Sequence, residues 1–277
     1  EIKRFNPDTI YYRKAIWYPG LISIFQKYKT IFEINTKEDD ETKLLPLIKQ
    51  IIYWYSKDNF MNAASAFIAV TNEISNSLLN YKKETCVIGN GYDTNSVANF
   101  RIKKSSKPGC IMVISPNFQW HGEEKLKYLA KNLPGVDFKI VGISGRSEIS
   151  NLVYLGYLDG KRLIDQYSEC DIGIGTLSLY KKNMSEACPL KTCEYIAFGL
   201  PVIIGYRDTN LGEQDFVLNL GNYSDNVKNN VENIKNFIFK WHGKRIPKEA
   251  VKLVDIKEKE KKRVKYFEKI INNYSYE

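Results

Sequence analysis

The sequence predicts an α/β protein with parallel, doubly wound sheets, and three patterns support this fold class. Short apolar segments alternate with longer segments of helical periodicity along the whole chain. Several of the apolar segments are continuous and β-branched, as expected of strands buried on both faces. Repetition of strand, helix and strand places such strands side by side in a parallel sheet. With 277 residues, 43% of them hydrophobic, the chain has enough apolar material for two domains.

The elements follow one another in a regular order. Ten strands are expected, at 9–12, 30–35, 66–71, 86–89, 109–115, 137–143, 151–156, 171–176, 200–205 and 215–220. Helices are expected at 40–56, 73–83, 122–133, 161–169, 190–198, 225–241 and 246–274. Each strand up to 200–205 is thus followed by a helix or a turn that can return the chain to the same edge of a sheet.

A boundary is predicted at GNGYDTNS (89–96), where glycine, asparagine and aspartate cluster in turn chemistry. The chain is therefore divided into a domain at 1–92, a domain at 93–245 and a long charged C-terminal helix at 246–277. The second domain holds enough strands and helices for a complete Rossmann-like domain. The first has about four strands and is expected to be an incomplete domain of the same type.

Composition limits the function classes. The formal net charge is +9, which favours an anionic partner such as nucleotide phosphate or acidic lipid, or else reflects a lysine-rich solvated surface. The basic residues are not focused on one element and no nucleic-acid module is recognisable, so a nucleic-acid partner is not expected. Two histidines are too few for a histidine-based metal site. Five cysteines without a CxxC pair favour a reducing, cytoplasmic location. No apolar segment approaches the ~18 residues of a membrane span.

The segment SEACPLKTCEYIAFGLPVI (185–203) carries the clearest functional pattern. Helix packing explains its apolar positions, but not Glu186, Lys191 and Glu194. Pro189 fits a first helical turn, so the free backbone N–H groups at Leu190 and Lys191 form a site for phosphate. Lys191 and Glu194 are three positions apart and share a face, where Glu194 can accept hydrogen bonds from a diol such as ribose. Glu186 can bind further hydroxyl groups. A ligand with a phosphate, a diol and further hydroxyls is a nucleotide sugar.

The same residues resemble a known family. The pattern ExxPLKxxEYxAxGLPVI is similar to that of the retaining GT-B glycosyltransferases of the group-4 family (GT4). AFIAVTNEIS resembles a strand and helix of that family's N-terminal domain, and CVIGNGYD resembles its interdomain linker. WHGEEKLKYLAKNLPGVDFKIVG and NLVYLGYLDGKRLIDQYSECDIGI resemble parts of its donor domain. The resemblance covers residues 63 to 205, in the family's order.

The resemblance implies a GT-B fold, in which two Rossmann-like domains form the protein and the last helix returns to the N-terminal domain. It implies that Glu194 binds the ribose hydroxyls and that the catalytic Glu186 contacts the transferred sugar. Backbone amides at Leu190, with Lys191, would hold the diphosphate of the donor. Gly156–Tyr157 would lie near the base. Such enzymes use neither a metal nor a further cofactor, and positive groups stabilise the leaving diphosphate instead.

The sequence departs from the family in the first loop of the donor domain, SPNFQWHG (115–122). The family's arginine is absent there and His121 stands where its lysine is expected. We expect Asn117 and His121 to line the diphosphate site, with Lys125 or Arg146 as a substitute cation. A neutral His121 donates one hydrogen bond but adds less charge. The alternative is an ordinary surface histidine.

Three residues of the first domain are candidates for the acceptor side. Glu33 and Asn35 occupy the strand end where the family carries a histidine, and Arg13 ends the first expected strand. Carboxylate and amide groups can bind an acceptor hydroxyl, and Arg13 can bind an acidic acceptor or a phosphate. The alternatives are a strand-end residue for Glu33 and a structural salt bridge for Arg13.

One apolar segment leaves two alternatives open, and one charged segment has a single interpretation. Residues 43–57, KLLPLIKQIIYWYSK, fit either a membrane surface, where lipid-linked acceptors reside, or a helix packed on the first sheet. The alternating charges of 257–265 predict a solvated helical face.

The function expected from these patterns is transfer of a hexose from a nucleoside-diphosphate sugar to a saccharide or lipid-linked acceptor of the cell surface. The reaction would proceed with retention, in the cytoplasm or at the inner face of the membrane. The alternatives are a non-catalytic nucleotide-sugar binding protein of the same fold and a nucleotide-sugar epimerase.

Overall fold

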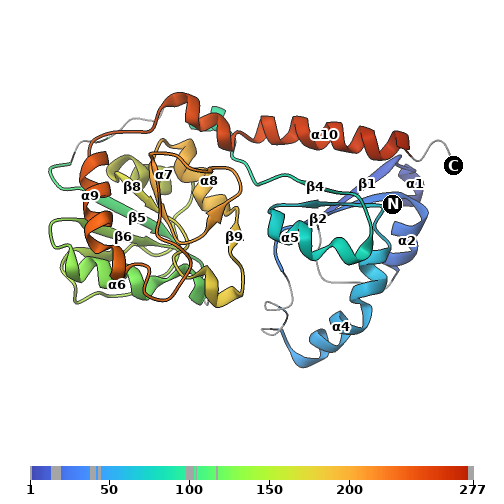
Figure 1. Ribbon diagram of the computed structural model, residues 1–277, viewed down its shortest axis with the longest axis horizontal. Coiled ribbons are helices and arrows are strands. Elements are labelled where there is room, and N and C mark those ends of the chain that lie inside the picture. Colours follow the sequence, from blue (N-terminus) through green and yellow to red (C-terminus); the bar gives the residue numbers. More distant parts are fainter. Residues whose placement is uncertain are drawn as a thin grey trace. The chain divides into compact units, whose positions relative to one another are not determined.

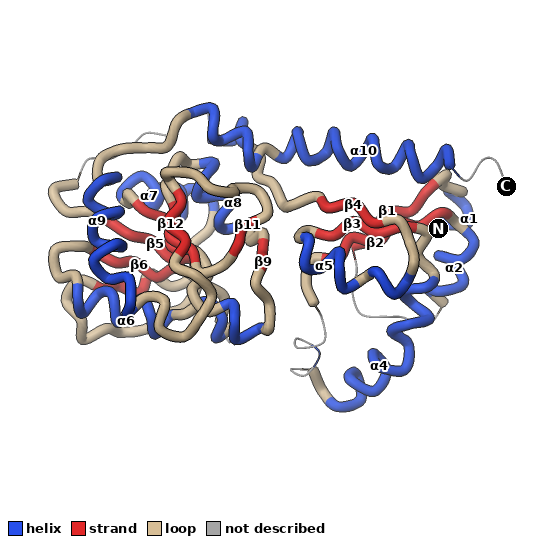
Figure 2. Tube along the Cα trace, in the orientation of Figure 1, coloured by secondary structure: helices blue, strands red, loops and turns tan. Residues whose placement is uncertain are grey.

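The computed structural model describes residues 2–13, 20–37, 42, 45–97, 103, 105–116 and 118–273. The chain forms two compact units, each with its own parallel sheet (Figure 1). The N-terminal unit comprises Glu1–Gly89 together with Lys259–Glu277, and the C-terminal unit comprises Asn90–Glu258. Figure 2 shows the strands of each sheet side by side, with helices around them.

The N-terminal unit contains a four-stranded parallel sheet in the order β1-β2-β3-β4. Its strands are β1 (Thr9–Arg13), β2 (Lys29–Ile34), β3 (Ala66–Ala69) and β4 (Thr85–Val87). Its helices are α1 (Ile2–Phe5), α2 (Leu21–Lys27), α4 (Leu47–Asn62) and α5 (Asn72–Ser77). Most of the last helix, α10 (Ile256–Asn273), also belongs to this unit.

α10 completes the core of the N-terminal unit. Tyr266 and Ile270, four residues apart on one face, are buried against Ile31 of β2 and Ile68 of β3. The Tyr266 hydroxyl donates to the carbonyl of Glu84 at 2.9 Å. The far end of the chain therefore covers the first sheet, as an apolar helix stripe packed on buried strands must.

The C-terminal unit has a six-stranded parallel sheet in the order β12-β10-β8-β5-β6-β7. Its strands are β5 (Gly109–Val113), β6 (Asp137–Val141), β7 (Leu152–Tyr154), β8 (Ile172–Ile174), β10 (Val202–Ile204) and β12 (Val217–Asn219). Its helices are α6 (Glu123–Asn132), α7 (Gly160–Glu169), α8 (Leu190–Ala197) and α9 (Val231–Trp241). The first strand, β5, is central, β6 and β7 extend the sheet on one side, and the chain then returns to place β8 on the other. This is the Rossmann order, whose switch point lies between β5 and β8.

All ten expected strands are confirmed, with each end shifted by at most two residues. The short helices α1 and α2 were not predicted, and neither was a two-residue parallel pair, β9 (Glu186–Ala187) with β11 (Arg207–Asp208). The single helix expected from residue 246 is wrong. A 3₁₀ helix (Lys248–Val254) comes first, and Asp255 then bridges to Tyr92 in extended conformation before α10 begins. The Tyr92 backbone accounts for this break, because its N–H donates to Val254 and its carbonyl accepts from Ile256.

Gly142, directly after β6, is required by the backbone. Its φ is +108°, and a Cβ there would lie 1.8 Å from the carbonyl oxygen of Ile114. We expect Gly142→Ala to lower the free energy of unfolding by about 2–4 kcal/mol, because it combines backbone strain with a clash against main chain. Urea denaturation measures this. Gly135→Ala, in a turn with open space around the added carbon, is the control, and an equally small effect at both positions would contradict the expectation.

Candidate functional site

At the switch point, the helix after β8 inserts side chains between two central strands. The ladder between β5 and β8 ends at the pair of Ile111 and Gly173. Beyond it, the N–H of Val113 donates to the Tyr195 hydroxyl at 2.8 Å, and the Val113 carbonyl accepts from Lys191 Nζ at 3.0 Å. Both partners come from α8. The backbone of β5 is thus satisfied by side chains where its neighbour strand leaves it, and the carboxyl end of β5 lies against the start of α8.

Lys191 also contacts His121, so α8 meets the loop after β5. Lys191 Nζ lies 3.0 Å from His121 Nδ1. Burial lowers the pKa of Lys191 to about 7. Burial, with the neighbouring charges of Lys191 and Lys182, lowers the pKa of His121 to about 3. His121 is therefore neutral at pH 7, and the bond from Lys191 assigns the proton to Nε2.

His121 Nε2 is buried and has no hydrogen-bond partner among the described residues. A buried N–H donor without an acceptor costs about 1–3 kcal/mol. Native structures keep such groups mainly where a ligand or water satisfies them. The loop after β5 thus holds a free donor next to a cation of lowered pKa, which is a suitable arrangement for an anion.

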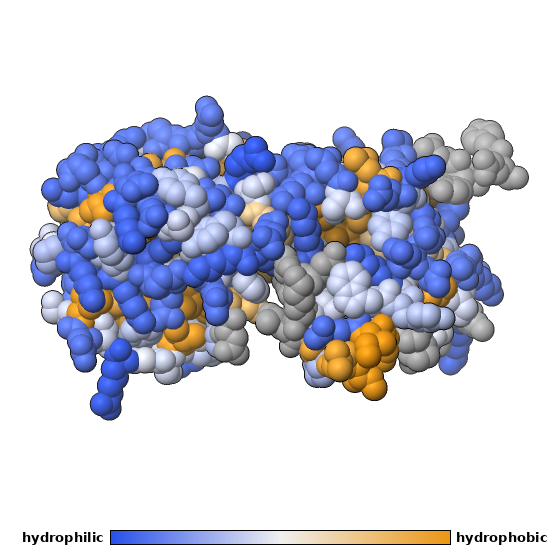
Figure 3. Space-filling model, turned by 60° about the horizontal axis from the view of Figure 1, so that its bottom comes forward, coloured by the Kyte–Doolittle hydropathy of each residue, from blue (hydrophilic) through white to orange (hydrophobic). Residues whose placement is uncertain are grey.

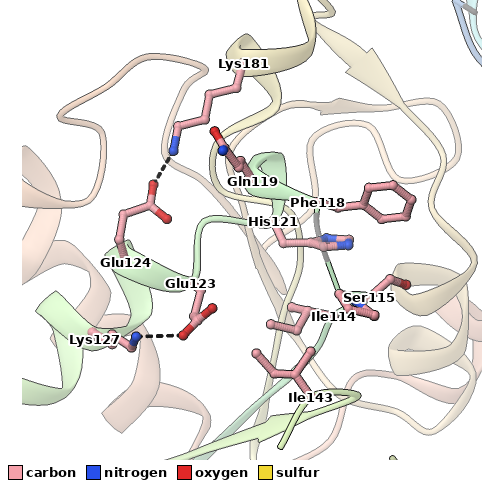
Figure 4. A pocket seen from close by; sticks show the side chains of 11 residues that line it. Ile114, Ser115, Phe118, Gln119, His121, Glu123, Glu124, Lys127, Ile143 and Lys181 are labelled. Atoms are coloured by element: carbon pink, nitrogen blue, oxygen red, sulfur yellow. Dashed lines mark hydrogen bonds and ion pairs between the residues drawn. The ribbon is translucent and has the colours of Figure 1, made fainter. Parts of the chain in front are cut away.

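A cavity of about 510 Å³ opens beside this pair (Figure 4). Its volume lies within the range of small-molecule sites. Its lining comprises Ile114, Ser115, Pro116, Phe118, Gln119, His121, Glu123, Glu124, Lys127, Ile143 and Lys181. Lys127 pairs with Glu123 and Lys181 pairs with Glu124, each at 2.7 Å. The phenyl ring of Phe118 stacks on Trp120 with centroids 4.5 Å apart. The cavity therefore combines apolar residues after two strands, the ring of Phe118 and two lysines that are each paired with a glutamate.

The lowered pKa of His121 has a consequence for acid stability. In the unfolded chain histidine takes up a proton near pH 6.5, whereas folded His121 does so only near pH 3. The unfolded state therefore binds more protons across this window, and stability falls as the pH falls below about 6.5, by up to about 1.4 kcal/mol per pH unit. His121→Gln, which keeps an acceptor for Lys191, is expected to lose less stability between pH 6.5 and 4.5. Denaturation at each pH measures this, and an equal loss of stability in the two proteins would contradict the expectation.

Glu194 is held by two tyrosines. The Tyr167 hydroxyl donates to Glu194 Oε2 at 3.0 Å, and the Tyr92 hydroxyl donates to Oε1 at 3.3 Å. Burial raises the pKa of Glu194, and the two hydroxyl donors act in the opposite direction. Tyr167 is itself fully buried on α7. The carboxylate is thus fixed from two sides, and neither tyrosine was found from the sequence, although GNGYD was recognised as the segment between the domains.

Glu186 comes before Pro189, and Leu190 follows Pro189 as the first residue of α8. Glu186 belongs to β9, and its Oε1 lies 3.3 Å from an Arg207 guanidinium nitrogen, whose side chain is 71% exposed. The first helical residue, Leu190, is exposed. Arg207 was not predicted, since its place beside Glu186 depends on the pairing of β9 with β11.

The structure does not bring Lys125 or Arg146 to the cavity. Lys125 Nζ donates to the carbonyls of Leu177 and Tyr223 and to Asn226 Oδ1, at 2.9, 3.0 and 2.6 Å. Arg146 lines a separate hollow at the other end of α6. The cations near His121 are instead Lys191, Lys181 and Lys182, and Lys182 lies 4.9 Å from the Trp120 ring centre. Asn117 lies outside the described residues.

Gly156 and Tyr157 follow β7 at the same edge of the sheet. Gly156 adopts a positive φ of 68°, and its carbonyl accepts from Gly142 N at 2.8 Å. Tyr157 is 71% exposed. The loops after β6 and β7 are therefore linked through their backbones, and the exposed Tyr157 lies next to this link.

The acceptor-side candidates lie together within the N-terminal unit, at the ends of β1 and β2. Asn35 Nδ2 donates to Glu33 Oε1 at 3.2 Å, and Arg13 Nε lies 3.9 Å from the same oxygen. Glu33 Oε2 lies 3.4 Å from Arg263 of α10, which is almost fully buried. The solvated face predicted for 257–265 is therefore wrong at Arg263, because a buried carboxylate requires a paired charge.

The part of the chain that the structure describes contains no group of three or more histidine, cysteine, aspartate or glutamate side chains arranged to hold a metal ion. Within the same residues, no helix has both the length and the apolar character needed to cross a bilayer.

No family model matches this chain, and no curated protein is similar to it in sequence. Solved structures are similar in fold. A glycosyltransferase from Rickettsia africae superposes with a TM-score of 0.69 at 15% identity, over 98% of this chain and 79% of that one. Sucrose-phosphate synthase from Thermosynechococcus elongatus gives 0.71 at 13% identity, over 98% and 76%. The fold is of the GT-B type. The Anabaena protein HepE, crystallised with UDP and glucose, gives 0.66 at 13% identity, over 96% and 79%. At these identities the likeness establishes the two Rossmann-like parts of a GT-B protein and not its activity.

Proposed function

We propose that this protein is a retaining, metal-independent glycosyltransferase of the group-4 family. In this proposal it moves a hexose from a nucleoside-diphosphate sugar to a saccharide or lipid-linked acceptor of the cell surface, in the cytoplasm or at the inner face of the membrane. The observation that carries the proposal is the group formed by Lys191, His121 and Glu194 at the switch point of the C-terminal unit.

These residues suit the parts of a nucleotide sugar. Lys191, the His121 Nε2–H and the free N–H groups at the start of α8 are the donors for a diphosphate. Glu194 is a fixed acceptor for the two hydroxyls of ribose. The loop at Gly156–Tyr157 would take the base. The UDP and UDP-glucose present in the Anabaena structures of similar fold support a uridine nucleotide as the first donor to test.

The proposed reaction does not require a side-chain base. In transfer with retention, the departing diphosphate oxygen can itself accept the proton of the acceptor hydroxyl, and the protein stabilises the charge that develops on that diphosphate. Lys191 and His121 would serve this role. Glu186, beside Arg207, would orient hydroxyls of the transferred sugar. Glu33, Asn35 and Arg13 would contact the acceptor.

The test is a donor panel with the full-length protein. UDP-, GDP- and ADP-sugars are first screened by calorimetry, and the bound ones are then assayed for hydrolysis and for transfer to a lipid-linked saccharide, with and without EDTA. We expect one nucleotide series to bind and to be turned over, with activity unchanged by EDTA. Absence of binding across the panel would overturn the proposal.

A second candidate is favoured by one observation. The loop 115–122 contains no arginine, and its histidine is neutral. This reduced charge fits a protein of the same fold that binds a nucleotide sugar without transferring it. Tight binding without turnover, for the donor that binds best and with a range of acceptors, would select it. Release of an epimerised nucleotide sugar would instead indicate an epimerase.

A further inference from the structure

The first half of α4 exposes an unusual number of large apolar side chains. They are Leu47, Ile48, Ile51, Ile52, Trp54 and Tyr55, with exposed fractions of 72%, 68%, 59%, 37%, 51% and 87%. Figure 3 shows an apolar patch on the surface of the N-terminal unit. Soluble monomers rarely leave such a contiguous patch uncovered unless it binds something.

The exposed face of α4 changes character along the helix. Successive residues turn by roughly 100°, so Leu47, Ile51, Tyr55, Asp58 and Asn62 follow one another on a single face. All five positions are exposed. The face is apolar up to Tyr55 and polar from Asp58 onward.

The opposite face of the second half holds α4 in place. Ser56, Phe60 and Met61 are buried, and the Phe60 ring packs against Phe25 and Phe32 at centroid distances of 5.7 and 5.1 Å. The helix is thus fixed at its C-terminal half by the core of the N-terminal unit. The apolar stripe of the first half cannot be reassigned to that core, because it lies on the face that the second half exposes to water.

The chemistry of the stripe fits a bilayer surface. Trp54 and Tyr55 are the residues that membrane interfaces prefer. Lys49 is exposed, and Lys57 Nζ lies 5.2 Å from the Trp54 ring centre. From Leu45 to Lys57 the sequence contains two lysines and no acidic residue, in a chain of net charge +9. This pattern complements anionic headgroups.

Apolar insertion is the main driving force expected here. The stretch Leu47–Tyr55 extends about 13 Å as a helix. A helix that lies along the membrane surface inserts its apolar face to a depth of about 5–10 Å. Four acidic residues at 38–41 precede it in the sequence and lie outside the described residues. Binding should therefore depend on the apolar side chains first and on lipid charge second.

We propose that the first half of α4, Leu47–Tyr55, is a membrane-docking surface that inserts into the headgroup region of an anionic bilayer. Its purpose, to bring the N-terminal unit to a lipid-linked acceptor, rests on the proposed function, whereas the docking itself rests only on α4. Docking can therefore be tested without donor or acceptor.

The test is flotation of the full chain with vesicles of phosphatidylcholine, alone or mixed with phosphatidylglycerol. We expect the parent to float with the mixed vesicles more than with the neutral ones. Ile51→Glu should lower the apparent affinity for the vesicles by roughly tenfold or more. It removes an isoleucine that docking would bury in the bilayer and puts a charge in its place. Asn59→Glu, on the polar half of the same helix, is the matched control and should bind like the parent.

A second readout locates the contact. Vesicles with brominated acyl chains should quench tryptophan fluorescence of the parent, and most of that quenching should be lost in Trp54→Phe. Both Ile51 and Asn59 are exposed, so the variants should unfold at the parent's temperature and hydrolyse a bound donor at the parent's rate. Failure to float, or equal flotation of Ile51→Glu and Asn59→Glu, would overturn docking and leave donor turnover unaffected. A dimer that Ile51→Glu dissociates, seen by light scattering in the absence of vesicle binding, would assign the surface to a second copy instead.

Discussion

Glu194→Ala is expected to weaken nucleotide-sugar binding by roughly 10- to 100-fold and to lower turnover at least as much. The replaced carboxylate accepts from two tyrosine hydroxyls and, in the proposed function, from the ribose diol. Hydrogen bonds to a charged group contribute about 1.5–3 kcal/mol, which gives this range. Calorimetry with the best donor measures the binding, and product detection measures the turnover.

The same carboxylate is not expected to stabilise the fold at neutral pH. Burial raises the pKa of Glu194 above its value in the unfolded chain. Such a group stabilises the fold below the unfolded pKa, and this contribution is lost as the pH rises through the folded pKa. At pH 7 the charge is a cost, so Glu194→Gln should unfold at the same or a higher temperature than the parent while it binds donor less well. Full donor binding by Glu194→Ala would contradict the role of Glu194. So would a loss of donor binding that is explained by unfolding of the variant.

The tyrosines provide a graded control. Tyr167→Phe and Tyr92→Phe each leave the carboxylate in place but remove one hydroxyl that orients it. We expect a smaller loss of affinity, about 3- to 10-fold, in line with one ordinary hydrogen bond. An effect as large as that of Glu194→Ala would indicate that the tyrosine itself contacts the ligand.

The parts of this site that follow from local pattern were predictable, and the parts that join distant segments were not. The strands around β5 and β8 are continuous apolar segments, and Lys191 and Glu194 share a helix face by spacing alone. The contact of Lys191 with His121 joins residues 70 positions apart. It depends on the loop after β5 reaching the start of α8, which no local pattern encodes.

Helix phase could have improved two of the predictions. Lys125 stands four positions before the buried Leu129 of α6, so it shares the core-facing side of that helix and donates inward. In α4, the sequence offered a membrane helix or a packed helix for the whole of 43–57. The structure shows one helix with a packed second half and an exposed first half. The residues that hold it on the core, Phe60 and Met61, both lie in the second half.

Lys191→Met should be the most damaging single substitution for donor binding, by roughly 100-fold or more. The ammonium is held by the Val113 carbonyl and His121 Nδ1 in the position proposed for the diphosphate. A charge-assisted contact to phosphate in a site of low dielectric is worth about 3 kcal/mol or more, and methionine keeps the volume without the charge. His121→Gln keeps the cation and its acceptor and removes only the neutral Nε2–H donor, so it should weaken donor binding much less than Lys191→Met.

The lowered pKa of Lys191 gives this prediction a readout beyond affinity. With a pKa of about 7, most Lys191 side chains are neutral at pH 8 in the free protein. A bound diphosphate favours the charged form and raises that pKa, so binding should take up close to one proton at pH 8 and almost none at pH 6. A nucleotide sugar is the right ligand, because its diphosphate carries no group that titrates in this range. Calorimetry in buffers of different ionisation enthalpy measures the uptake. It should persist in His121→Gln and vanish in Lys191→Met, and uptake that survives in Lys191→Met would place the responsible cation elsewhere.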